Sequence, residues 1–261
     1  MSDTPVSESQ VDFHSFVEIV RRLRKECPWD RDQTHESMRT PFIEEVYEAV
    51  DAIDSRDWPA LAEELGDVLL NVVFQAVLAE EAGRFTIADV LERETSKLVF
   101  RHPHVFGDVT VDDADHVLRN WEQLKKTESN RESVLDGVPR ALPGLLFAER
   151  VQSKAARVGF DFPTRDGAWE KVTEEVEELR AVDPADRERW SEELGDLLFA
   201  VVNIGRLNGV SPEMELRAAN DKFTRRFRHI EARLREQGRG PDDASLEEMD
   251  QYWEEAKNAK R

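Results

Sequence analysis

The chain has 261 residues and a mass of 30.1 kDa, which is enough for one large domain or two small ones. With 36 Lys and Arg residues against 56 Asp and Glu residues, its formal net charge is −20, and so acidic a chain disfavours general nucleic-acid binding. A single cysteine, Cys27, excludes an intrachain disulfide framework. Because we find neither a secretion signal nor an apolar run near the roughly 20 residues of a membrane helix, we expect a soluble, cytoplasmic protein without a membrane partner.

Hydrophobic residues in the first half recur with the 3.6-residue period of a helix, and we find no convincing strand pattern. Pro41 suits the first turn of a second helix, and Gly83 is placed to end a third. The Cys-Pro-Trp-Asp segment before the second helix is expected to be a loop that Trp29 anchors to the core. The helices that we expect span about 13–23, 41–53, 59–82 and 87–100, and a fifth contains Val117, Leu118, Trp121 and Leu124.

Residues 127–144 contain two prolines and two glycines among polar residues, which makes them the best linker candidate. We therefore assign residues 1–126 to a first helical domain and residues 145–261 to a second. The helices expected beyond the linker span about 144–157, 166–181, 185–208, 212–236 and 245–259.

The two halves contain a direct internal repeat. Residues 63–74 align with residues 192–203 at an offset of 129, and eight of the twelve positions are identical. Upstream, residues 44–48 align with residues 174–178 at an offset of 130. The sequence therefore predicts an all-α protein built from two homologous helical domains in tandem.

Each half also carries four acidic side chains at helical spacing. Residues three apart lie on one face of a helix, and the short connections between the helices favour antiparallel neighbours. Converging carboxylates raise one another's pKa and oppose packing unless a cation neutralises them. Oxygen ligands alone select a hard ion, Mg²⁺ or Mn²⁺. The first quartet is Glu45, Glu48, Glu64 and Asp67, and the second is Glu175, Glu178, Glu193 and Asp196.

A solvated acidic face is the alternative, because acidic residues make up about a fifth of the chain. Two observations favour a site instead: the pattern occurs twice, and each Glu-Glu-Leu-Gly-Asp block leads directly into an apolar run. Gly66 and Gly195 lie in mid-helix, where glycine costs about 1 kcal/mol relative to alanine. We expect a close approach of the neighbouring helix at these two glycines.

Six blocks of sequence carry a more specific pattern. They are Cys-Pro-Trp-Asp-x-x-Gln-Thr-His at 27–35, the acidic block 44–48 with 64–67, Arg-His-Pro-His-Val-Phe-Gly-Asp at 101–108, Lys-Ala-Ala-Arg-Val-Gly-Phe-Asp at 154–161, the acidic block 174–178 with 193–196, and residues 220–227. Over essentially its whole length the chain resembles the MazG family of tandem-domain nucleoside triphosphate pyrophosphohydrolases, part of a wider all-α superfamily.

This resemblance implies hydrolysis of a nucleoside triphosphate to the monophosphate and pyrophosphate, by attack at the α-phosphorus, as nucleotide-pool housekeeping. It implies Mg²⁺ held by Glu175, Glu178, Glu193 and Asp196, and a homodimer whose C-terminal half is the active one. Because both quartets are intact, the sequence leaves open a second site at Glu45, Glu48, Glu64 and Asp67.

A triphosphate carries about four negative charges, so an acidic protein binds it only through metal and a local basic cluster. Lys222 and Arg226 share a helix face and can reach the phosphates, although a solvated basic face is the alternative. Lys257 and Lys171 are further candidates for binding substrate. Trp253 is expected either to stack on the base or close the pocket edge, or else to be a core aromatic.

Candidates for orienting or deprotonating the attacking water are Glu174 and Glu192, and the sequence does not choose between them. A different class of function also stays open, namely a non-catalytic tandem helical scaffold or nucleotide sensor. A di-iron carboxylate protein is excluded, since it requires Glu-x-x-His pairs and none of the six histidines has a glutamate three residues before it.

Overall fold

The computed structural model describes residues 12–113, 116–117, 120 and 133–258. Every regular element in this part of the chain is a helix, so the all-α prediction is confirmed. The chain divides into two compact units, Met1–Ser129 and Asn130–Arg261, and the division falls within the suggested linker 127–144. No described helix has the length and apolar character needed to cross a bilayer.

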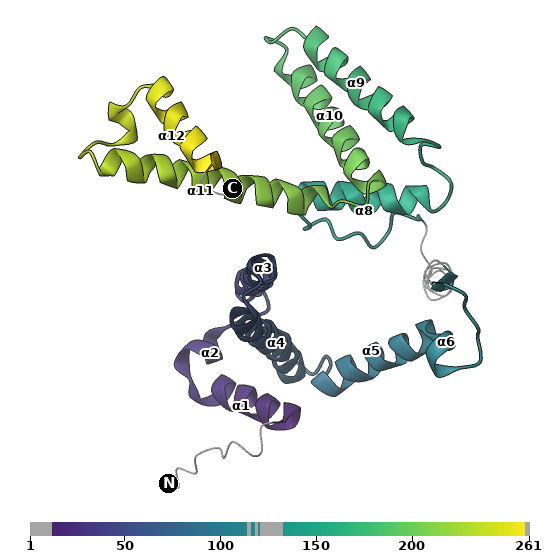
Figure 1. The fold of residues 1–261 in the computed structure, drawn as a ribbon. Coiled ribbons are helices and arrows are strands. Elements are labelled where there is room, and N and C mark those ends of the chain that lie inside the picture. The colour runs from purple at the N-terminus through teal and green to yellow at the C-terminus, as the bar shows by residue number, and fades with distance from the viewer. Residues whose placement is uncertain (1–11, 114–115, 118–119, 121–132, 259–261) are drawn as a thin grey trace. The chain divides into compact units, whose positions relative to one another are not determined.

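The first unit is built around the long helix α4, which packs against α3 on one side and α1 on another. Its core lies where α1 meets the second half of α4, and Val20, Val73 and Phe74 are its largest fully buried side chains. The helices of this unit are α1 (Phe13–Glu26), α2 (Pro28–Asp32), α3 (Arg39–Ser55), α4 (Trp58–Glu81), α5 (Ile87–Arg101) and α6 (Pro103–Phe106), as Figure 1 shows.

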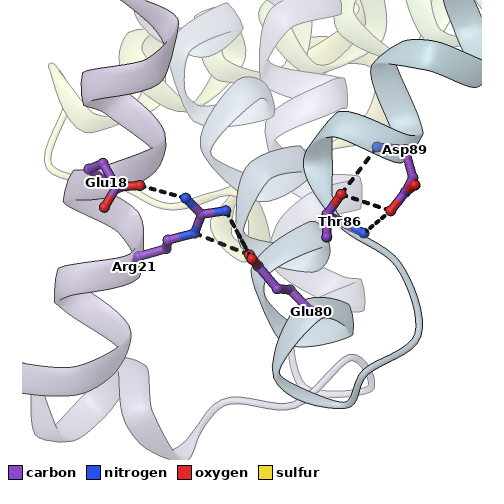
Figure 2. A network of polar contacts seen from close by, with 5 residues as sticks. All are labelled: Glu18, Arg21, Glu80, Thr86 and Asp89. Atoms are coloured by element: carbon purple, nitrogen blue, oxygen red, sulfur yellow. Dashed lines mark hydrogen bonds and ion pairs between the residues drawn. The ribbon is translucent and has the colours of Figure 1, made fainter.

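Short-range sequence signals set the helix ends of this unit. Thr86 and Asp89 form a reciprocal capping box at the start of α5, drawn in Figure 2. In the same figure, Arg21 of α1 reaches Glu80 near the end of α4 at 2.8 Å and Glu18 on its own helix at 2.5 Å. These polar contacts link α1 to the end of α4 and define the start of α5.

The Cys-Pro-Trp-Asp segment is not the loop that the sequence suggests, because it forms the short helix α2. Trp29 is 61% exposed and therefore does not anchor the segment to the core. Arg24 has that role instead. Its side chain is 9% exposed, and its guanidinium donates to the carbonyl oxygens of Asp30 and Gln33 and pairs with Glu81 of α4 at 2.6 Å.

The second unit repeats the antiparallel helix pair of the first. Helices α9 (Arg165–Ala181) and α10 (Arg187–Leu207) pack side by side, as α3 and α4 do, and α8 (Gly144–Ala156) packs against α10. Helix α11 (Pro212–Arg235) begins beside α8, and α12 (Leu246–Asn258) folds back along it after a 3₁₀ turn, η2 (Pro241–Asp243), as Figure 1 shows. The helices predicted for this half are all present.

Two further predictions concern the mid-helix glycines and the fifth helix of the first half. A Cβ built at Gly66 or Gly195 meets nothing within 4 Å, so the predicted close helix approach at these glycines is wrong for the part of the chain described. Of the predicted fifth helix, Val117 lies in helical backbone. Leu118, Trp121 and Leu124 lie outside the described residues.

Candidate functional site

Carboxylates from α9 and α10 converge in the second unit. Glu175 of α9 and Glu193 and Asp196 of α10 each place an oxygen within 4.8 Å of the other two. Glu175 is buried, Glu193 is half-buried and Asp196 is exposed. Glu178, the fourth predicted member, is exposed one turn further along α9 and lies outside this group. The structure therefore brings together three of the four carboxylates that the spacing suggests.

Glu175 has an unusual environment for a carboxylate, because it is only 4% exposed. One oxygen, Oε1, pairs with the ammonium of Lys171 one turn earlier at 2.6 Å. The other oxygen, Oε2, is buried and has no hydrogen-bond partner. An unpaired buried polar atom costs about 1–3 kcal/mol, and more for a charged group. A cation between the three carboxylates would remove this cost, so the donor set fits a hard metal ion.

Two basic side chains border this cluster. Lys171 also bonds Glu174 at 2.8 Å, and its hydrogen bonds to Glu174 and Glu175 raise the pKa of Lys171, so it stays charged. Arg189 of α10 lies 3.7 Å from Glu193. Lys171 is among the residues expected to bind substrate, whereas the position of Arg189 was not anticipated.

The corresponding cluster of the first unit contains Glu45 and Glu48 of α3 and Glu64 of α4, again within 4.8 Å of one another. Asp67 lies outside that group, although its charge still acts on Glu45. Burial raises the pKa of Glu45, and the Asp67 and Glu48 charges add to the effect. Burial followed by the Glu48 and Glu45 charges raises the pKa of Glu64. No cation is among the causes that shift the pKa values of Glu45 and Glu64.

The repeat explains the difference between the two clusters. At the offsets of the repeat, Lys171 aligns with Pro41 and Arg189 aligns with Ala60. Neither residue of the first unit can supply a positive charge at those places. The two units thus share the acidic residues of the repeat and differ at these two aligned positions.

A cavity of about 590 Å³ opens beside the second cluster, a volume typical of small-molecule sites. Glu175, Asp196 and Lys171 line one end of it. Most of the remaining wall is apolar and includes Phe162 and Phe199. The carboxylates of the second unit and a ligand-sized cavity are therefore parts of one continuous site.

Four residues expected to bind substrate lie on the α11–α12 pair instead. The Arg226 guanidinium carbon is 5.3 Å from the centre of the Trp253 ring, and Trp253 is half-buried. Lys222 is exposed on α11, and Lys257 pairs with Glu254 on α12. None of these four residues lines the cavity. The structure brings Arg226 and Trp253 together but does not bring them to the carboxylates of the same chain.

The two candidates for orienting water have different surroundings. Lys171 holds Glu174 next to Glu175, at the border of the cluster. Glu192 is exposed on α10, beside Glu193 in sequence. The geometry does not choose between them.

Sequence reasoning missed several polar residues at the cavity, among them Gln152 of α8 and Asn203 of α10. A signal for Asn203 was present: it ends the repeated block in an apolar run, where the first half has Phe74. A polar residue in place of a buried aromatic indicates a hydrogen-bonding task. Gln152 carries no comparable signal, since only tertiary packing buries it.

Comparison with known proteins agrees with this architecture. The family described as MazG nucleotide pyrophosphohydrolase domain matches residues 33–106 and 165–231, which contain both carboxylate clusters. The "Nucleoside triphosphate pyrophosphohydrolase/pyrophosphatase MazG" of Thermotoga maritima is 42% identical over 257 residues, or 97% of this chain and 98% of the relative. The "Nucleoside triphosphate pyrophosphohydrolase" of Escherichia coli K12 is 40% identical over 253 residues, or 93% and 95% of the two chains. This chain belongs to the MazG nucleotide pyrophosphohydrolase family.

Proposed function

We propose that this chain hydrolyses nucleoside triphosphates to nucleoside monophosphate and pyrophosphate, by attack of water at the α-phosphorus and with Mg²⁺ as cofactor. The observation that carries the proposal is the buried Oε2 of Glu175, which has no hydrogen-bond partner although Glu175 gathers with two further carboxylates. The names of the Thermotoga maritima and Escherichia coli relatives support the same reaction.

In this proposal, Glu175, Glu193 and Asp196 hold the ion, and Glu178 is the fourth ligand from the next turn of α9. An all-oxygen donor set suits Mg²⁺, and Mn²⁺ is a suitable substitute. When bound, Mg²⁺ supplies positive charge for the phosphate oxygens and lowers the pKa of a coordinated water.

The basic residues beside the cluster bind the phosphates in this proposal. The chain carries a net charge of −20, so its field repels a triphosphate unless positive charge is placed locally. Lys171 and Arg189 place two such charges at the border of the carboxylates. Glu174 or Glu192 orients the attacking water.

We further propose that the working form is a homodimer. Helix α10 leaves Leu198, Phe199 and Val201 between 46% and 49% exposed, although it is the central helix of its unit. Exposed apolar side chains in such a group are typical of a surface that another chain covers. A second copy would also bring its own α11–α12 pair, with Lys222, Arg226 and Trp253, to the site. Light scattering on the purified chain measures the mass directly, and a monomer at micromolar concentration contradicts this part.

Hydrolysis in water enriched in ¹⁸O tests the reaction. We expect equal amounts of monophosphate and pyrophosphate, with the label in the monophosphate, because the α-phosphorus keeps the oxygen that attacks it. Label in pyrophosphate would show attack at the β-phosphorus. Diphosphate with orthophosphate would show attack at the terminal phosphorus. Chelation of Mg²⁺ should abolish product formation, and addition of Mg²⁺ or Mn²⁺ should restore it.

The alternative function, a nucleotide sensor or scaffold without catalysis, has a distinct outcome in the same experiment. Such a protein binds a triphosphate with Mg²⁺ yet releases no product over hours. Binding measured by calorimetry, in parallel with product analysis, therefore separates the two functions.

A further inference from the structure

The later part of the suggested linker 127–144 is folded into a defined turn, and we call residues 133–142 the strap. The Asp136 amide donates to the Ser133 carbonyl oxygen at 3.1 Å, and the Ser133 amide donates to the Asp136 carboxylate at 2.9 Å. Gly137 follows with φ of +78°, a conformation that glycine adopts at little cost. A glycine that suggests a linker from composition therefore builds a turn.

A lysine of α8 holds the strap. The Lys154 ammonium donates to the carbonyl oxygen of Asp136 at 2.6 Å, across a sequence separation of 18 residues. A hydrogen bond from a charged donor is shorter and stronger than one between neutral groups. Because the acceptor is a main-chain atom, this bond holds the backbone of the strap next to Leu135.

Leu135 makes the strap part of the cavity beside the carboxylates of α9 and α10. It lines that cavity together with Val151 and Ala155 of α8. Leu135 is 44% exposed, so it does not belong to the buried core, and its apolar surface would be covered when a ligand fills the cavity. Its neighbour Val134 is similarly exposed, at 49%, but does not line the cavity. Of these two adjacent apolar side chains, only Leu135 is part of the wall.

The other non-helical part of the cavity wall is held in a similar way. Residues 159–162, in the connection between α8 and α9, also line the cavity. Within this connection, Asp161 pairs with Arg206 of α10 at 2.5 Å. Each non-helical segment that encloses the cavity is therefore tied to a helix by a basic side chain.

We infer that the strap is a wall of the substrate cavity, and that Lys154 is a positioning residue that holds this wall through the Asp136 carbonyl oxygen. The inference rests on the proposed function, because the wall affects turnover only if the substrate occupies the cavity. Lys154 does not itself line the cavity, so its effect on a substrate passes through Leu135. A wall that contacts the substrate equally before and during the reaction affects KM and leaves kcat unchanged.

The first test compares Leu135→Ala with Val134→Ala in steady-state hydrolysis of ATP with Mg²⁺. For Leu135→Ala we expect KM to rise about fivefold, with kcat unchanged, because apolar contact with the bound substrate is lost. Val134→Ala is the matched control, since it shortens a similarly exposed apolar side chain of the same strap. It should leave KM and kcat unchanged. Equal effects of the two variants, or an unchanged KM for Leu135→Ala, overturn the inference.

The second test asks whether Lys154 acts through Leu135. Lys154→Met removes the ammonium and keeps an unbranched stem, and we expect KM to rise about fivefold at unchanged kcat. Lys154→Arg keeps a charged donor and should restore most of the loss. The double variant of Lys154→Met with Leu135→Ala should have the KM of Leu135→Ala alone, because both changes act on one wall. If the two rises in KM multiply, Lys154 acts by another route and is not the positioning residue of the strap.

Hydrogen exchange of the full chain, measured by mass spectrometry, separates this inference from the proposed reaction. The probe is the α,β-methylene analogue of ATP with Mg²⁺, which water does not cleave between the α- and β-phosphorus. We expect the analogue to slow exchange of the strap amides about fivefold, because a filled cavity disfavours local opening of its wall. Lys154→Met should remove most of this protection.

The two proposals fail in different ways in this experiment. If the analogue protects the strap of a chain that hydrolyses no triphosphate, the proposed reaction fails and the strap remains a wall of the cavity. If the chain hydrolyses ATP but the analogue leaves exchange of the strap unchanged, the reaction stands and the strap is rejected. A chain with neither hydrolysis nor protection contradicts both.

Discussion

Replacing Glu175 by Gln removes one negative charge from the carboxylates of α9 and α10 while keeping the shape of the side chain. Glu175 is the buried member of that cluster and the partner of Lys171. The change therefore separates two quantities that usually fall together, the stability of the metal-free fold and the activity with Mg²⁺.

Two electrostatic effects of this change nearly cancel in the metal-free protein. At the 4.8 Å limit of the cluster, two like charges repel by about 3.5 kcal/mol at an effective dielectric constant of about 20. Loss of the Glu175 charge thus relieves about 7 kcal/mol against Glu193 and Asp196 on this scale. The 2.6 Å ion pair with Lys171 is worth about 6 kcal/mol on the same scale, before solvent screening weakens all three terms. We therefore expect the free energy of unfolding to stay within about 2 kcal/mol of wild type.

In the proposed metal site, activity depends on the same charge, and its loss there is not offset as it is in the metal-free fold. Changing a residue that merely supports a metal ligand typically costs 10- to 100-fold in affinity or activity, so losing a ligand should lower turnover by more than about 100-fold. The assay is pyrophosphate release across a Mg²⁺ titration, with urea unfolding in chelator alongside. Glu177→Gln is the matched control, because Glu177 is exposed on the same helix. Wild-type turnover of Glu175→Gln, or a loss of stability beyond about 3 kcal/mol that explains the lost activity, would refute the assignment.

Three further predictions concern other parts of the chain. Gly195→Ala should raise the free energy of unfolding by about 1 kcal/mol with normal turnover, because a Cβ there meets open space; lower stability in urea would reveal a close neighbour at that turn. Glu193→Gln should lose more activity than Glu64→Gln, since cations border only the second cluster in the ion pairs described, and equal losses would contradict this reasoning. The hydrogen bond from Arg24 lowers the pKa of Glu81 below its ordinary value of 4.5. The Arg24–Glu81 pair therefore stabilises the fold above pH 4.5, and this stability is lost as pH falls through the lowered pKa. In Arg24→Met, NMR titration should show the Glu81 pKa returning toward 4.5, and an unchanged titration refutes the pairing.

Helical periodicity placed the helices well, because each is amphipathic or fully apolar over several turns and has local signals at its ends. Gly83, with φ of +63°, ends α4 as expected, because a left-handed residue costs glycine little. The repeated acidic block gave three members of each carboxylate cluster, since residues three apart share a helix face. These successes all depend on interactions within one or two helical turns.

The sequence does not predict which carboxylates meet across a helix pair, because that depends on how the two helices are shifted along each other. Spacing places Glu175 and Glu178 on one face, but the register between α9 and α10 decides which of them meets Glu193. In the second unit the carboxylate outside the cluster is Glu178, which lies on the first helix of the pair, α9. In the first unit it is Asp67, which lies on the second helix of the pair, α4. The close helix approach predicted at Gly195 is wrong for the same reason, because a glycine in mid-helix does not reveal what lies across an interface.

The two units show how a duplicated site can diverge without losing its acidic residues. Three carboxylates gather in each unit, yet burial raises the pKa of Glu45 and Glu64 in the first, which favours their neutral forms. In the second unit, Lys171 pairs with Glu175 and Arg189 lies beside Glu193. We expect these two cations to attract the phosphates of a substrate. A search for the active half of such a tandem protein should therefore compare the basic residues next to the acidic motif, because the motif itself is the same in both.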